Sequence, residues 1–143
     1  MANALFYAYR NGVLGSHATV VDLDADTIAV MFVDHADDTP VPATDDFLDD
    51  IASAGRVPAL ASCPNLASKT IGVVAVGVFD SVDPTFTALT GDQVESLIVF
   101  KDTNDHATSD LLAWYDTFTS GMPLTPNGGD VTVNVNASGW WTI

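Results

Sequence analysis

Short apolar runs separated by turn residues fill the chain from residue 57 onward, and this punctuation constrains the fold more than any other feature. Clusters such as Cys63-Pro64-Asn65, Thr90-Gly91-Asp92 and Ala137-Ser138-Gly139 interrupt the runs. Runs that recur at intervals of about ten residues, with turn signals between them, are typical of β-sandwiches and small barrels. The predicted strands span residues 57–63, 70–79, 85–89, 94–100, 111–118, 130–136 and 140–143.

Two further strands are expected at residues 17–21 and 27–33, on either side of an aspartate-rich turn. The second is almost entirely apolar, which indicates a strand buried on both faces. Residues 130–136, "DVTVNVN", alternate strictly, so their three valines share one face of a half-exposed strand. The "NASG" turn that follows predicts a hairpin between this strand and the last one.

Two short helices are predicted besides the strands. Residues 3–11 fit a helix that Asn3 caps, although the tyrosines there also suit a strand. Residues 44–54, "TDDFLDDIASA", have Thr44 as a suitable N-cap and acids in the first turn, where the helix dipole favours negative charge. The apolar stripe of this second helix consists of Phe47, Leu48 and Ile51.

These segments together predict a mainly β fold, a single-domain β-sandwich or jelly-roll-like barrel of residues 1–143 with one or two short helices. A chain of this length suits one domain and buries roughly 70% of its unfolded surface. No linker or internal repeat divides it. No apolar run reaches the roughly 18 residues of a membrane-spanning helix.

The charge of the chain is strongly unbalanced. Nineteen acidic residues face four basic ones, which gives a net charge of −15. A surface of this kind repels phosphate backbones and anionic lipid, so we expect no direct nucleic-acid binding and no membrane association. Self-repulsion destabilises the compact state, and salt relieves it. We therefore expect a halophilic or marine source.

The segment Asp22-Leu23-Asp24-Ala25-Asp26 has the alternating acids that open a helix-loop-helix calcium site. Thr27 stands where such a loop has its glycine, and Val33 stands where it has its closing glutamate. The flanking segments also read as strands instead of helices. A solvated turn is the simpler interpretation, because Asp stabilises turns by accepting hydrogen bonds from nearby backbone. An open calcium site of another kind is the alternative.

Two other loops combine a histidine with carboxylates. His35 lies beside Asp34 and Asp37-Asp38, and His106 lies in "DTNDHATSD". Zinc sites draw three or four ligands, often sulfur or several histidines, and no such spacing occurs here. We therefore predict no metal site and no cofactor.

No arrangement for nucleophilic catalysis is evident, so we predict no enzymatic activity. Ser16 and His17 are only chain neighbours, and the motif Gly-x-Ser-x-Gly is absent. Cys63, the single cysteine, reads as a small buried hydrophobe. Glu95, the single glutamate, reads as a surface residue at the start of a strand, with a buried carboxylic acid as the alternative.

Trp140 and Trp141 are adjacent near the end of the chain. In a strand their side chains point to opposite faces, so at most one faces the core of a one-sided sheet. The other would be exposed or covered by a partner. We predict a partner contact at Trp140 and Trp141, with a plain core role and a sugar-stacking platform as the alternatives.

The second half of the chain resembles a group of small structural proteins encoded by tailed phages. The resemblance covers most of the chain and is most specific from residue 82 onward. The sequence departs from the group in its acidity and in its "NASGWWTI" end, which replaces a more polar, basic hairpin. The segments that carry the resemblance are "DTI" at 26–28, "FLDDI" at 47–51, "VDPTFT" at 82–87, "SLIVFKDT" at 96–103 and "MPLTPNGGD" at 122–130.

The resemblance implies a virion structural protein that binds the capsid surface of a tailed virus and decorates or cements it. Its partners would be the major capsid protein or other virion proteins, and it would form a homo-oligomer, a trimer or a dimer. Its location would be the virion, assembled in the host cytoplasm. The alternative is a tail- or fibre-associated domain that recognises a host glycan, with an Asp loop holding Ca²⁺.

Overall fold

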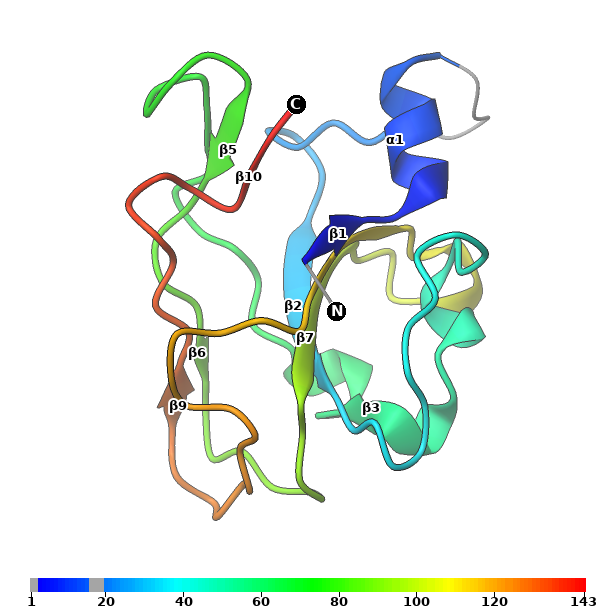
Figure 1. Ribbon diagram of the computed structural model, residues 1–143, viewed down its shortest axis with the longest axis vertical. Helices are drawn as coiled ribbons and strands as arrows, with labels where there is room; N and C mark the ends of the chain where they lie inside the picture. The colour runs from blue at the N-terminus through cyan, green and yellow to red at the C-terminus, as the bar shows by residue number, and fades with distance from the viewer. Residues whose placement is uncertain (1–2, 16–19) are drawn as a thin grey trace.

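The computed structural model describes residues 3–15 and 20–143. A five-stranded antiparallel sheet forms the middle layer, and every residue of its interior strand β2 is buried (Figure 1). The prediction of a fully buried strand at 27–33 is confirmed for Ile28–Val33, while Thr27 is exposed and precedes the strand. The order of strands in this sheet is β1 (Ala4–Leu5), β8 (Leu111–Tyr115), β7 (Ser96–Lys101), β2 (Ile28–Val33) and β3 (Arg56–Val57).

Two small sheets cover one face of this middle layer. One has the order β10 (Trp141–Thr142), β5 (Val78–Asp80) and β4 (Thr70–Ile71), and the other pairs β6 (Thr85–Phe86) with β9 (Val131–Thr132). The same two chain segments run side by side through both sheets (Figure 1). The rings of Phe32 and Phe86 stack with their centroids 4.4 Å apart and so join the two layers.

Short helical segments cover the opposite face. They are the 3-10 helices at Leu48–Asp50, Ser53–Gly55, Leu60–Ser62 and His106–Thr108. Helix α1 (Tyr7–Val13) follows β1, and its buried Tyr9 packs in the core on the side of the small sheets. Successive side chains of β2 and β7 alternate between the two faces, so the sheet separates two hydrophobic cores. The molecule is therefore mainly β and sandwich-like, as the sequence predicted.

The predicted helix at 44–54 is wrong. Phe47 is extended and forms a bridge with Asp110, and only single 3-10 turns follow it. The Asp50 carboxylate accepts the backbone N–H groups of Asp46 and Phe47, and the Asp45 carboxylate accepts that of Val41. Aspartate side chains thus bind the backbone donors that a helix would use. Leu48 and Ile51 are nevertheless buried, as the apolar stripe predicted.

The helix predicted at 3–11 is displaced. It starts only at Tyr7, because the preceding residues form strand β1, and Gly12 lies inside it. Asn3 does not cap it; instead, the Asn3 Oδ1 atom accepts the N–H groups of Asp116 and Thr117 at the end of β8. The N-terminal segment therefore combines both alternatives, a strand and then a helix.

Four strand predictions also need correction. The strand expected at 57–63 is limited to Arg56–Val57, because Pro58 has no N–H group for the ladder. The run 70–79 is a hairpin, β4 and β5, whose loop contains Gly72 and Gly77 at positive φ. The run 85–89 keeps only two strand residues. Of the strand expected at 17–21, residues 17–19 lie outside the described residues, and residues 20 and 21 are not in a strand.

The hairpin predicted between the last two strands is wrong, because β9 pairs with β6 while β10 pairs with β5. The "NASG" segment does turn the chain, but it passes the chain from one small sheet to the other. The predicted alternation is correct although β9 is short: the three valines are partly buried against the core, and Thr132, Asn134 and Asn136 are exposed.

Gly139 offers a test of this crossing turn. Its φ is 82°, and a Cβ atom there would lie 2.5 Å from the Val78 Cγ1 atom and 2.7 Å from the Phe79 carbonyl oxygen. Gly121 has a similar φ of 87° but nothing within 4 Å of such an atom. Alanine at either position costs about 1–2 kcal/mol, because a residue with a Cβ atom is strained in the left-handed region. We expect Gly139→Ala to lose at least about 1 kcal/mol more unfolding free energy than Gly121→Ala, because overpacking adds to its cost.

Urea unfolding of the two variants measures this difference. Equal losses would mean that the close approach of the turn to β5 is not maintained in solution.

Candidate functional site

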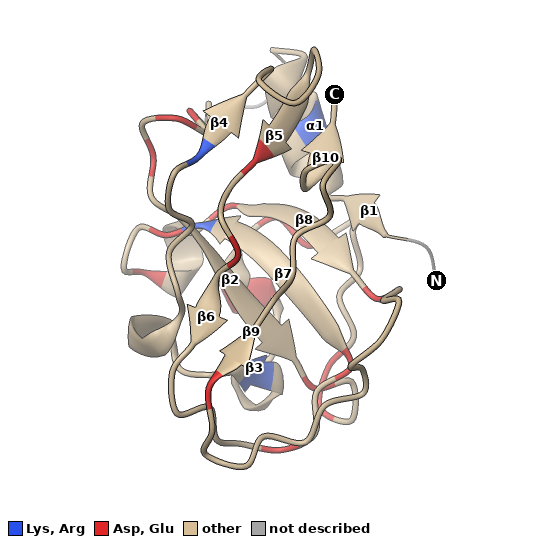
Figure 2. Ribbon diagram, turned by 90° about the vertical axis from the view of Figure 1, so that its left-hand side faces the viewer, with Lys and Arg blue, Asp and Glu red and all other residues tan. Residues whose placement is uncertain are grey.

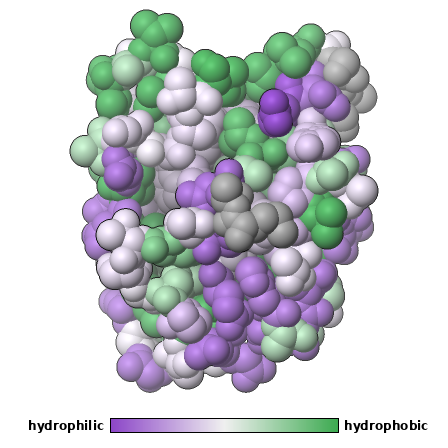
Figure 3. Space-filling view, in the orientation of Figure 1, coloured by the Kyte–Doolittle hydropathy of each residue, from purple (hydrophilic) through white to green (hydrophobic). Residues whose placement is uncertain are grey.

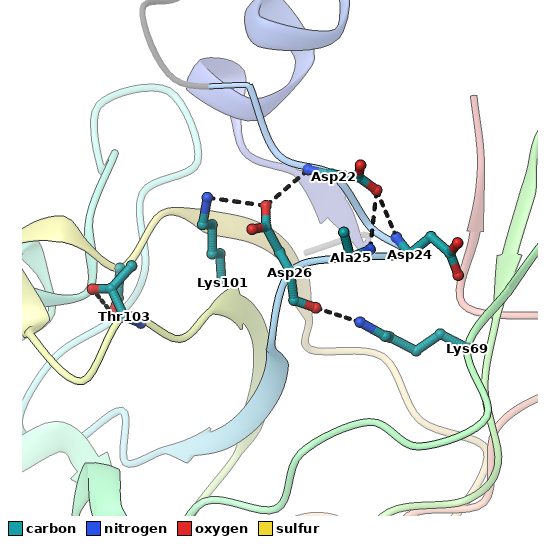
Figure 4. Close-up of polar contacts among 8 residues, drawn as sticks. Asp22, Asp24, Ala25, Asp26, Lys69, Lys101 and Thr103 are labelled. Carbon is teal, nitrogen blue, oxygen red and sulfur yellow. Dashed lines mark hydrogen bonds and ion pairs between the residues drawn. The ribbon is translucent and has the colours of Figure 1, made fainter.

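The aspartate turn between residues 22 and 26 is closed by its own hydrogen bonds (Figure 4). The Asp22 Oδ1 atom accepts the backbone N–H groups of Asp24 and Ala25, each at 3.1 Å. The Asp26 Oδ2 atom accepts the Asp22 N–H at 2.8 Å, and the Asp26 N–H donates to the Asp22 carbonyl oxygen. The acids therefore stabilise a turn that leads directly into β2, which is the simpler interpretation of their spacing.

Two of the four basic side chains converge on this turn (Figure 4). The Lys101 Nζ atom lies 2.9 Å from the Asp26 Oδ2 atom, and the Lys69 ammonium donates to the Asp26 carbonyl oxygen. Burial raises the pKa of Asp26, but the hydrogen bonds from Lys101 and the Asp22 N–H and the charges of both lysines outweigh it. The net effect holds the pKa of Asp26 below its usual range.

An ammonium group thus binds the carboxylate that a calcium ion would need. Within the described residues, one group of three or more metal-binding side chains has ligand atoms close enough to share an ion, and it does not include Asp22, Asp24 or Asp26. The cationic partner of this turn comes from the chain itself.

That one group consists of Asp34, Asp37 and Asp92, whose carboxylate oxygens lie within 4.8 Å of one another. Asp34 is buried and its Oδ1 atom accepts the Ala36 N–H at 2.7 Å, while Asp37 and Asp92 are exposed. Sequence reasoning joined Asp34 and Asp37 with His35 and missed Asp92, because Asp92 follows a different strand. Three like charges this close repel one another unless a cation or salt screens them.

Neither histidine completes a metal site within the described residues. The His35 ring points to the Ser96 hydroxyl, with the Nε2 and Oγ atoms 2.8 Å apart. His106 starts a 3-10 helix that the Asp105 carboxylate caps through the Ala107 N–H. The contact between His35 and Ser96 joins residues 61 positions apart in the chain, so no local sequence pattern predicts it. Ser96 is fully buried, so a substrate cannot reach this hydroxyl.

The other candidate reactive residues, Cys63 and Glu95, take part in packing and hydrogen bonding within the fold. Burial raises the pKa of the Cys63 thiol to about 12, and the Asp102 charge adds to this rise. The thiol is therefore protonated near neutral pH and packs against the core, as predicted. The Glu95 carboxylate is half-buried and accepts the His35 backbone N–H at 2.9 Å. Ser16 and His17 lie outside the described residues.

Both tryptophans lie in the hydrophobic core, each with 9% of its surface exposed. The expectation that at most one of them faces the core is wrong, because Trp140 precedes β10 and both indoles join the same core. Trp140 contacts Tyr115 and donates its Nε1–H to the Ser81 hydroxyl, and Trp141 packs between Tyr9 and Phe79. A sugar-stacking platform needs an open ring face, and neither indole offers one. The partner contact predicted at Trp140 and Trp141 stays a prediction and carries no part of the proposals below.

Exposed apolar side chains gather instead at one end of the molecule. Residues 71–77, which include the β4–β5 loop, contain no charged residue and expose Val76 by 93% and Val73 by 75% (Figure 2). Helix α1 adds exposed Val13 and Leu14, and Ile143 lies between. Figure 3 shows two apolar lobes at this end with a hollow between them, while hydrophilic side chains dominate the opposite end. We call this surface the apolar end.

A groove of about 620 Å³ lies within the apolar end. Its walls come from β1, from one side of α1 and from the last residues of β10 and beyond. Of the described residues that line it, Arg10 alone has a charged side chain. In the described part of the chain, no helix is both long and apolar enough to cross a membrane.

No family model matches the chain, and no curated protein matches it.

The Asp26 carboxylate provides a test by pH. Asp26→Asn should lower the unfolding free energy by about 1 kcal/mol at neutral pH, because the charged pair with Lys101 is lost. The folded pKa of Asp26 lies below the unfolded value, which is roughly 3.9. This stabilisation is therefore fully present above the unfolded pKa and is lost as pH falls through the folded pKa.

Urea unfolding at neutral and at acidic pH should show the two proteins converging in acid. Asp24→Asn is the matched control, because Asp24 is exposed and its carboxylate has no described partner. A loss of the same size at every pH would contradict the ion pair.

The cluster of Asp34, Asp37 and Asp92 provides a test by salt. Asp92→Asn should raise the melting temperature in low salt, because it removes like-charge repulsion of the order of 1 kcal/mol. The gain should vanish in molar salt, where the screening length falls to about 3 Å. Calcium that raised the melting temperature of the parent protein, but not that of Asp92→Asn, would instead indicate a cation site.

Proposed function

We propose that the protein is a structural component of a tailed-virus particle, without enzymatic activity, that binds the outer surface of the capsid and decorates or cements it. The resemblance of its second half to small tailed-phage proteins supports this function, and so does its sandwich-like mainly β fold. The proposal includes the virion as its location, a halophilic or marine host, and self-association as a dimer or trimer, since symmetric shells favour closed oligomers.

The observation that carries the proposal is the uneven distribution of charge. A chain of net charge −15 leaves residues 71–77 uncharged and strongly exposed. Large exposed apolar patches mark interaction sites, and a patch without charges can be buried without the desolvation cost that a carboxylate imposes. The acidic remainder of the surface would face solvent and keep particles apart by repulsion.

A weak contact is sufficient for this function. Burial of one exposed valine contributes about 1 kcal/mol or somewhat more. When copies bound side by side on one shell also contact each other, each copy is held by two contacts. The second contact then forms within an existing complex, so the overall binding is stronger than either contact alone. The apolar end therefore needs no deep pocket to hold the protein on a capsid.

The test replaces the two most exposed valines of residues 71–77. The double variant Val73→Ser, Val76→Ser should bind particles lacking the protein about 30-fold more weakly than the parent protein, which corresponds to about 2 kcal/mol. Val41→Ser is the matched control, because Val41 is 49% exposed and lies outside the apolar end. Cosedimentation with purified particles measures the binding.

Copy counting in purified particles, by quantitative mass spectrometry, separates the head from the tail. A copy number that follows the capsid lattice supports the proposal. A handful of copies per particle would indicate a tail or fibre protein, and equal binding by the double variant would show that residues 71–77 do not form the contact.

A further inference from the structure

We propose that the groove in the apolar end binds an extended peptide segment of the capsid protein as an added strand, with a carboxylate of that segment on Arg10. This inference rests on the proposed function for the identity of the partner. Four features of the groove support the binding of such a segment. They are the strand edges beside it, its size, its apolar walls and the charge of Arg10.

Two strand edges, each without a pairing strand among the described residues, flank the groove. β1 is the outer strand of the five-stranded sheet, and β10 is the outer strand of the small sheet with β5 and β4. Ala4, Leu5 and Thr142 of these strands all line the groove. An edge strand presents free backbone N–H and C=O groups, and an extended peptide satisfies them by adding a strand. A segment in this groove could pair with either edge and be covered by the other.

The size and the walls of the groove suit a short peptide. Its volume of about 620 Å³ lies within the range of pockets that bury most of a small ligand. Leu14 is 83% exposed, Ile143 is 60% exposed, and both line the groove. A bound segment with apolar side chains would cover these two residues. The backbone edges and the apolar walls together favour an extended peptide over a polar small molecule.

Arg10 determines the charge of the occupant. Its guanidinium lies 5.8 Å from the centre of the Tyr7 ring, and among the described residues no carboxylate is within ion-pair distance of it. Lys69 and Lys101, in contrast, are both held by Asp26. Arg56 likewise forms no ion pair among the described residues, but it is half-buried, whereas Arg10 is exposed. Guanidinium binds carboxylate through two parallel hydrogen bonds, so the partner segment supplies the acid.

A second copy of this chain is a poorer occupant than another protein. Each copy carries a net charge of −15, and two such chains repel when they approach. A capsid protein with an acidic residue on an extended arm meets the groove without bringing that excess charge. The short edges limit the added strand to a few residues, which is consistent with a weak, repeated contact.

The test combines one substitution with peptide mapping. Arg10→Gln should weaken binding to particles lacking the protein about tenfold or more, since it removes a hydrogen-bonded charge pair, and Arg10→Lys should recover part of the loss. Short overlapping peptides that cover the major capsid protein are then titrated into the ¹⁵N-labelled protein. One acidic peptide should shift the amide signals of Leu5 and Thr142, and Arg10→Gln should abolish that shift.

The outcomes separate this inference from the proposed function. If the parent protein binds particles and Arg10→Gln binds them equally well, the groove inference is wrong while the proposed function stands. If the parent protein binds no particles, the proposed function is wrong. If, in addition, no peptide shifts the amide signals of β1 and β10, the inference that the groove binds a peptide is wrong as well. Self-association that Arg10→Gln abolishes in sedimentation would identify a second copy as the occupant and overturn the assignment to the capsid protein.

Discussion

Burial of both faces of the β2–β7 pair is the constraint on which the rest of the structure depends. Side chains of these strands alternate between two cores, so one sheet must be covered twice. The small sheets, together with Tyr9 of α1, cover one face, and the 3-10 segments cover the other. A chain this acidic can meet that requirement only by keeping its charges in the turns, where aspartate carboxylates bind backbone N–H groups. The acidity and the fold are therefore linked through the turns.

The parts of the fold that sequence predicted well are those whose burial is decided locally. An unbroken apolar run identified β2, and strict alternation identified the face of residues 131–135. The prediction failed at 44–54, where the apolar stripe was real but aspartate side chains and a bridge to Asp110 replaced the helical hydrogen bonds. It also failed at the last hairpin, because β9 and β10 pair with β6 and β5, whose partner residues are distant in the chain, as in Thr132 with Thr85 and Trp141 with Phe79.

The candidate sites show the same division. The missing glycine and glutamate were enough to predict a turn at Asp22–Asp26, but nothing local indicated that Lys69 and Lys101 would both reach Asp26. Asp92 joins Asp34 and Asp37 only because two loops meet, and the groove exists only because the edges of two different sheets lie side by side. Sequence patterns report what each residue prefers, whereas a site is made by residues that the topology brings together.

The placement of the few bases connects the fold with the proposed function. With four bases against nineteen acids, each position that a base occupies changes the local potential considerably. Lys69 and Lys101 stabilise the entry into β2, where the central sheet begins, so they serve the fold. Arg10 forms no ion pair among the described residues and lies at the apolar end, where residues 71–77 carry no charge. The surface therefore repels an acidic partner least at the apolar end. A contact at that end buries apolar side chains without placing the acidic residues of this chain against the acidic residues of its partner.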